Sequence, residues 1–137
     1  AYNDLSSFKI YMNDVGLLRN MANLDSRIVI EGDKLFEEFK GAFTENYILN
    51  MLSASLGKNP NYFTFDRHEI DFVIQYQNKV IPIEVKSSKS TNNASLTKYN
   101  EKYNNDLSIR FSMNNLNKDD KINIKKREKT ASIHNMA

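Results

Sequence analysis

The sequence predicts an α/β (α+β) domain, and three observations lead to that class. A long segment without proline, residues 33–56, carries apolar residues at the spacing of one helix. Three runs rich in β-branched and aromatic residues follow it, each bounded by turn formers: 62–65, 69–76 and 79–87. A second helical segment, 95–103, precedes a further strand at 107–113. Helices and strands in this order indicate a sheet with helices packed on it.

The length and net charge of the chain limit what kind of domain it can form. The chain has 137 residues and a formal net charge of +2, which suits one folded domain and permits, without requiring, an acidic partner. We divide it into an N-terminal strand and helix segment packed on the core, 1–32, a core, 33–126, and a polar tail, 127–137. The chain starts with Ala1, so we expect a fragment of a longer protein.

Several function classes are excluded by composition. There is no cysteine, which rules out disulfides, thiolate zinc sites and cysteine catalysis. No apolar run approaches the roughly 18 residues that span a bilayer. We therefore expect no membrane contact and, by default, a cytoplasmic location.

The outer elements have recognisable boundaries. Residues 8–14 alternate like a strand and stop at Asp14, a good N-cap for a short helix that follows. Residues 25–32 form a connector. Gly57 is placed to end the long helix as the residue after its last turn. The run 121–126 predicts a last strand.

The central hairpin sets the register of its side chains. A turn centred on Gln77 and Asn78 places these residues opposite one another: Tyr76 and Lys79, Ile74 and Ile81, Phe72 and Ile83, Asp71 and Glu84. Alternation then puts Ile70, Phe72 and Ile74 on one face and Asp71, Glu84 and Lys86 on the other. Pro82 cannot donate to the ladder, so we expect a bulge there or a position facing away from the partner strand.

Two opposed carboxylates point to a cation. Asp71 and Glu84, directly opposite, would have Cβ atoms about 5 Å apart and would repel each other. Mg²⁺ fits such a pair, because it takes one or two carboxylates and fills its other positions with water and phosphate. The simpler alternative is a solvated sheet face on which Lys86 neutralises both acids.

The long helix adds a third acid. At about 100° per residue, Glu45 lies within about 60° of Ile48, Leu49 and Leu52, with Gly41 and Ala42 on the same side. The helix is apolar over most of its circumference, so we expect it to be largely buried and the small residues to admit a close neighbour. A glutamate inside the stripe requires pairing, protonation or a metal, unless it reaches solvent at the edge.

Four motifs in order carry a family resemblance. The stretches "IDFVI" and "IPIEVKSSKS" resemble the signature of the PD-(D/E)XK nuclease superfamily. Together with "KIYMNDVGLL" and "FTENYILNML", they resemble the C-terminal domain attached to bacterial and archaeal AAA+ family ATPases, over about residues 8–125. The resemblance implies a restriction-endonuclease-like mixed sheet flanked by helices, with the long helix before the core hairpin.

The resemblance also implies roles for named residues. Asp71 and Glu84 would bind Mg²⁺ or Mn²⁺, with Glu45 acting on the metal directly or through water. Lys86 would orient or help deprotonate the attacking water, or stabilise the transition state of phosphodiester hydrolysis. Ser87, Ser88 and Lys89 would meet a DNA backbone. An AAA+ ATPase module would be the partner in the full-length protein.

Two features depart from the family pattern. His68 precedes the Asp71 strand where many relatives carry a small residue, and "KINIKKREKTASIHNMA" lacks the expected apolar ending. The alternative function is a catalytically inactive nucleic-acid- or protein-binding module that targets an associated ATPase. Substrate form and oligomeric state do not follow from the sequence.

Overall fold

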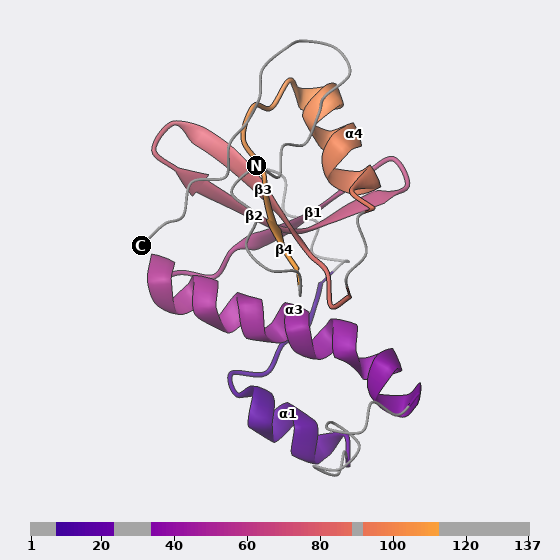
Figure 1. The fold of residues 1–137 in the computed structure, drawn as a ribbon. Helices are drawn as coiled ribbons and strands as arrows, with labels where there is room; N and C mark the ends of the chain where they lie inside the picture. The colour runs from indigo at the N-terminus through magenta and orange to yellow at the C-terminus, as the bar shows by residue number, and fades with distance from the viewer. Residues whose placement is uncertain (1–7, 24–33, 89–91, 113–137) are drawn as a thin grey trace.

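The computed structural model describes residues 8–23, 34–88 and 92–112, with the side chains of 34–38 left out. Within these ranges the domain consists of three helices and one four-stranded mixed sheet (Figure 1). The predicted α/β (α+β) class is confirmed. The predicted connector at 25–32, the strand at 121–126, Lys89 and the tail 127–137 lie outside the described residues.

The helices begin and end close to their predicted bounds. Helix α1 (Val15–Met21) is capped by Asp14, whose carboxylate accepts the Leu17 N–H at 2.8 Å. Helix α3 runs over Lys34–Leu56, and Gly57 then adopts a φ of +67° while its N–H donates to the Ser53 carbonyl. Helix α4 spans Ala94–Tyr103. Residues 8–14, predicted as a strand, run extended alongside α3 without joining the sheet.

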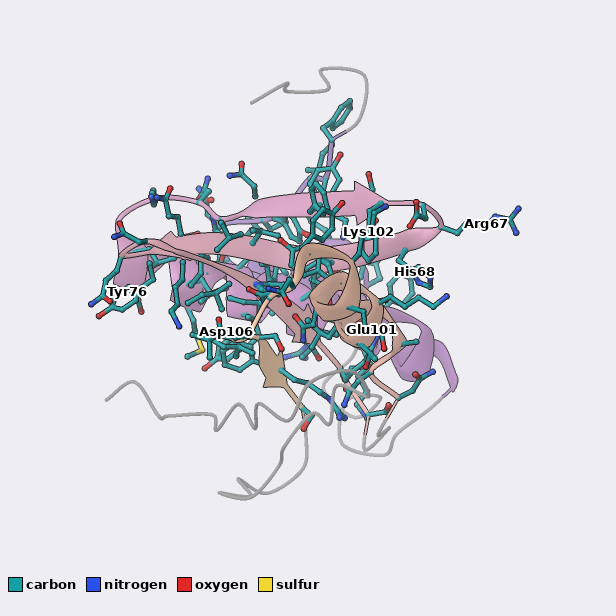
Figure 2. The ribbon with its side chains drawn as sticks, turned by 90° about the horizontal axis from the view of Figure 1, so that it is seen from above. Arg67, His68, Tyr76, Glu101, Lys102 and Asp106 are labelled. Carbon is teal, nitrogen blue, oxygen red and sulfur yellow. The ribbon has the colours of Figure 1, made fainter. Side chains whose placement is uncertain are left out.

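The sheet is built from two hairpins and one crossover. Its strands are β1 (Asn61–Phe65), β2 (His68–Tyr76), β3 (Lys79–Val85) and β4 (Ile109–Phe111), in that spatial order. The first three are antiparallel neighbours, and β4 lies parallel to β3 after the α4 crossover. The hairpin turns lie at opposite ends of the sheet, with Arg67 and Tyr76 beside them (Figure 2).

Two apolar clusters occupy the two faces of the sheet. Helix α3 covers one face, which we call the α3 face, with Ile48 and Leu49 packed on residues of β2 and β3. Helix α4 covers the opposite face, the α4 face, through Leu96 and Tyr99. Strand β3 therefore lies between the two helices, and its four consecutive residues from Ile81 to Glu84 are buried.

Helix α3 is less buried than its composition predicts. Asn46, Ile48 and Leu49 are buried, whereas Tyr47 and Met51 are about half exposed. A Cβ at Gly41 would have no atom of the described residues within 4 Å, so no element of that part of the chain approaches there. The prediction of a largely buried helix was wrong, because among the described residues the sheet covers only one stripe of α3.

Pro82 lies where its missing N–H costs no bond in the hairpin. The Val85 N–H points toward β2 and the Lys86 N–H toward β4, so the nitrogen of Pro82 faces the β4 side. Strand β4 begins pairing only at Ile83, one residue later. Of the two predicted solutions for Pro82, the structure uses a nitrogen that faces away from β2.

Candidate metal-binding site at the central hairpin

The β2–β3 hairpin has the predicted register. Its pairs run from Tyr76 and Lys79 at the turn to Phe72 and Ile83, and the next positions are Asp71 and Glu84. The two-residue turn is made possible by Gln77, which adopts a φ of +53°. The sequence motif is thus brought to the point where the regular ladder of β2 and β3 ends.

A β-bulge in β2 changes which face each residue occupies. Phe63 pairs with Ile70 but Asn61 pairs with Val73, so Asp71 and Phe72 together lie opposite one residue of β1. Ile70 consequently packs with Leu96 and Tyr99 on the α4 face, while Phe72 packs on the α3 face. The prediction that Ile70 shares a face with Phe72 and Ile74 was wrong, because strict alternation does not continue through a bulge.

The Asp71 carboxylate terminates the β2–β3 ladder. Its Oδ2 accepts the Val85 N–H at 2.7 Å, taking the place of a main-chain acceptor on β2. Burial raises the pKa of Asp71 to about 6. The Val85 N–H and Lys9 lower this pKa, and the nearby carboxylates of Glu84 and Glu45 raise it. Asp71 is thus a desolvated acid among other acids.

Glu84 is the most deeply buried acid of the site. It lies between Ile83 and Val85, which pack on the α3 face, so its side chain leaves the strand toward the α4 face. It is 4% exposed, and its Oε1 forms an ion pair with Lys86. Its Oε2 is buried without a hydrogen-bond partner in the described part of the chain. Burying a carboxylate oxygen without a partner lowers the stability of the fold by about 1–3 kcal/mol or more, unless water or a cation binds that oxygen.

Asp71 and Glu84 lie close enough for the Glu84 charge to raise the pKa of Asp71, but their side chains leave the strands in different directions. Asp71 turns an oxygen into the plane of the sheet, whereas Glu84 leaves toward the α4 face. No group of three or more histidine, aspartate or glutamate residues within 8–23, 34–88 and 92–112 is arranged to hold a metal. The two carboxylates are the kind of ligand that a hard cation would take, and water and a phosphate would fill its other positions.

Glu45 is held by the extended segment before α1, which lies outside the nuclease-signature stretches "IDFVI" and "IPIEVKSSKS". Lys9 Nζ lies 2.9 Å from Glu45 Oε1, and the Tyr11 hydroxyl donates to the same oxygen. Lys9 also forms an ion pair with Glu69 of β2. Burial opposes the charge of Lys9, but the two glutamates raise its pKa above the ordinary value. Burial and the Glu45 contact likewise raise the pKa of Tyr11. The glutamate in the apolar stripe is therefore paired.

The extended segment before α1 is fixed by one amide. The buried Asn46 side chain accepts the Met12 N–H at 2.8 Å and donates to the Met12 carbonyl at 2.8 Å. This pairing places Lys9 and Tyr11 beside Glu45. Sequence reasoning missed both residues, which lie more than 30 positions from Glu45. The signal available was the alternation of the segment, which puts Lys9 and Tyr11 on the same side.

The remaining predicted residues lie at the edge of the site. Lys86 follows β3 and is half-buried, and its N–H donates to the Phe111 carbonyl of β4. Ser87 is partly exposed and Ser88 exposed. His68 packs its ring 5.6 Å from that of Phe65. None of the described helices combines the length and the apolar character that crossing a bilayer requires.

The fold and this site define an α/β domain with buried acids on its central hairpin. The chain belongs to the family described as Domain of unknown function (DUF4143), which matches residues 40–134. The matched region contains Glu45, Asp71, Glu84 and Lys86, and leaves Lys9 outside.

Two curated relatives give the sequence context of the domain. They are uncharacterized proteins of Mycobacterium tuberculosis and Mycobacterium bovis, each 30% identical over 84 residues. The matches cover 60% of this chain and 18% of each relative, so the chain spans under a fifth of their length. No solved structure matches the chain.

Proposed function

We propose that this domain is a Mg²⁺-dependent nuclease that hydrolyses phosphodiester bonds in DNA. The observation that supports it most is the buried Glu84 oxygen without a partner, close to the ion-paired Lys86. Asp71 supports it as well, because its raised pKa reflects a desolvated acid that a divalent cation would stabilise in its charged form. The Glu84 and Lys86 spacing is also the one that resembles PD-(D/E)XK nucleases.

The proposal gives each side chain a task. Glu84 and Asp71 would hold Mg²⁺ or Mn²⁺, which supplies a Lewis acid and a more acidic bound water. Lys86, whose ammonium lies at Glu84, would orient the attacking water or stabilise charge on the phosphate. Glu45 would act through water, because Lys9 and Tyr11 occupy one of its oxygens. Ser87, Ser88 and Lys89 would contact the DNA backbone.

The proposed setting follows from the resemblance and from the length of the relatives. Because the matched region is 18% of each curated relative, the rest of such a protein has room for further domains. We place the domain at the C-terminal end of an AAA+ ATPase, in the cytoplasm, where the motor would deliver DNA to it.

A second candidate is a catalytically inactive module that binds nucleic acid or protein for an associated ATPase. The hydrogen bonds from Lys9 and Tyr11 to Glu45 favour this candidate, because they occupy one oxygen of an acid that a nuclease would use. So does the absence of a three-acid metal group from the part of the chain that the structure describes. In this case Lys86 alone would neutralise Glu84.

A cleavage assay distinguishes the two. The wild-type chain is incubated with single-stranded, duplex and branched DNA in Mg²⁺, in Mn²⁺ and in a chelator. We expect cleavage only with a divalent ion. Glu84→Gln, Asp71→Asn and Lys86→Ala should each reduce its rate by about 100-fold or more, because they remove a metal ligand or the group that activates water.

Matched control variants separate chemistry from folding. Glu101→Gln and Lys98→Ala change exposed residues of α4 (Figure 2 shows Glu101), and their cleavage rates should equal that of wild type. Unchanged cleavage in Glu84→Gln would overturn the assigned site. If wild type cleaves no DNA form and Mg²⁺ leaves its melting temperature unchanged, the inactive module is the better account.

A further inference from the structure

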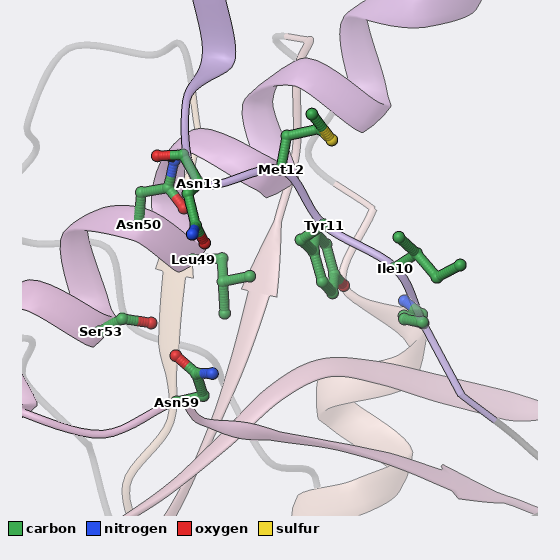
Figure 3. Close-up of a pocket in the computed structure, with 9 residues that line it drawn as sticks. Ile10, Tyr11, Met12, Asn13, Leu49, Asn50, Ser53 and Asn59 are labelled. Carbon is green, nitrogen blue, oxygen red and sulfur yellow. Dashed lines mark hydrogen bonds between the residues drawn. The ribbon is translucent and has the colours of Figure 1, made fainter. Parts of the chain in front are cut away.

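A concave pocket adjoins the acids on the far side of Lys9 and Tyr11. Its volume is about 540 Å³, within the range of about 300–1,000 Å³ typical of small-molecule sites. One wall is the extended segment Lys9–Asn13, and the other is formed by Leu49, Asn50 and Ser53 of α3 with Asn59 from the loop that follows (Figure 3). Lys9 and Tyr11 line this pocket and also bind Glu45, so the two residues separate the pocket from that acid.

The lining combines an apolar floor with amides and a hydroxyl. Leu49 is buried and lies at the floor. The Ser53 hydroxyl oxygen is buried without a hydrogen-bond partner among the described residues. Figure 3 shows the Ser53 hydroxyl and the Asn59 amide directed toward the same space. Asn50 donates its amide N–H to the Asn13 carbonyl, which fixes the rim between the two walls.

We propose that this pocket binds one unpaired nucleobase of a single-stranded nucleic acid. An asparagine amide offers both a donor and an acceptor, which matches the hydrogen-bonding edge of a base. Leu49 offers apolar surface that a flat ring can cover. The Ser53 hydroxyl would gain the partner that it lacks. The choice of a nucleic acid rests on the proposed function, since the neighbouring acid site is the one assigned to a phosphodiester.

The arrangement determines which strand form the domain accepts. A base paired in a duplex has its hydrogen-bonding edge occupied and cannot enter a pocket between two walls. A base in a single strand enters without a cost of unpairing. The backbone next to it could then lie toward Lys9, which lines the pocket and forms an ion pair with Glu45.

Binding is measured in chelator, so that no cleavage takes place. A short fluorescein-labelled single strand of mixed sequence is titrated with the full chain and followed by anisotropy. The same strand annealed as a duplex, and a strand of the same length without bases, serve as competitors. We expect Asn59→Ala and Ser53→Ala each to weaken single-strand binding by about 3- to 10-fold, the effect of one or two lost hydrogen bonds.

The matched control is Asn20→Ala, which removes an exposed asparagine of α1 outside the pocket. Its affinity should equal that of wild type, and the pocket variants should bind the strand without bases as wild type does. Equal binding of single strand and duplex, or unchanged affinity in both pocket variants, would overturn the proposal. Melting curves show that each variant is folded.

Two further outcomes separate this proposal from the nuclease. Pocket-dependent binding by a protein that cleaves nothing would retain the base site and reject the proposed catalysis. Metal-dependent cleavage with unaltered binding in Asn59→Ala and Ser53→Ala would do the reverse.

Discussion

The Asp71 side chain has two roles to account for: it ends the hydrogen-bond ladder between β2 and β3, and it brings a negative charge to the acid cluster. It replaces a main-chain acceptor for Val85, which alone would account for an aspartate at this position. The desolvation that raises its pKa to about 6 is a cost that ladder capping does not require, since an asparagine would accept the same N–H. An aspartate in place of an asparagine is therefore the reason why the proposed site includes a cation.

This cost leads to a prediction on stability against pH. The pKa of Asp71 is above its ordinary value of 3.8, so the folded state binds the proton more tightly than the unfolded chain. Stability from this residue is full below about pH 4 and is lost as the pH rises to about 6. In chelator, Asp71→Asn should therefore gain about 1–3 kcal/mol over wild type across this window and keep it above.

Urea unfolding at a series of pH values measures the difference. Asp106→Asn, which changes an exposed aspartate paired with Lys79, should follow wild type at every pH. A constant difference between Asp71→Asn and wild type from pH 4 to pH 8 would show that Asp71 titrates alike in both states.

Among the elements, the extended segment before α1 depends on α3 for its position. The Asn46 amide makes two hydrogen bonds to the main chain of Met12, and Glu45, its neighbour, receives Lys9 and Tyr11. This segment thus sets both the charge balance of the acids and one wall of the pocket. If this segment were a strand of the sheet, it would provide neither the partners of Glu45 nor the wall of the pocket.

Because the segment depends on α3 for its position, we expect alanine substitution of two asparagines one turn apart on α3 to lower stability by unequal amounts. Asn46→Ala leaves a main-chain donor and acceptor without partners and should cost about 2–3 kcal/mol of unfolding free energy. Asn50→Ala removes one exposed hydrogen bond to Asn13 and should cost less than about 1 kcal/mol. Urea unfolding followed by circular dichroism compares them. Equal losses would mean that the segment is not anchored through Asn46.

The elements also show what the sequence could and could not predict. The turn residues Gln77 and Asn78 determined the hairpin register, and Asp14 and Gly57 marked helix ends, because these are local signals. The bulge at Asp71 and Phe72 depends on how β1 pairs with β2, which no local pattern encodes. The partners of Glu45 were missed for the same reason: they come from a distant segment.

At the scale of the whole molecule, β3 is the centre of the fold. It pairs with β2 on one side and β4 on the other, and both of its faces are covered by helices. Helix α1, in contrast, has no buried residue. Local stability should therefore decrease from β3 toward α1.

Amide hydrogen exchange followed by NMR measures this gradient. The Ile81 and Ile83 amides, which point toward β2 from almost fully buried residues, should be among the slowest to exchange, near the rate set by global unfolding. Amides within α1 should exchange at least about 100-fold faster, as expected for a helix that opens on its own. Similar protection in both would mean that α1 and the sheet unfold together.

The bulge in β2 makes this strand intolerant of a change in length. Losing one residue at Asp71 or Phe72 would restore plain alternation, and the residues before that point would exchange faces. Glu69 would then turn in beneath α4, against Leu96 and Tyr99, far from the ammonium of Lys9 that now receives it. Insertions and deletions that spare the fold therefore belong in the two-residue turns at either end of the strand.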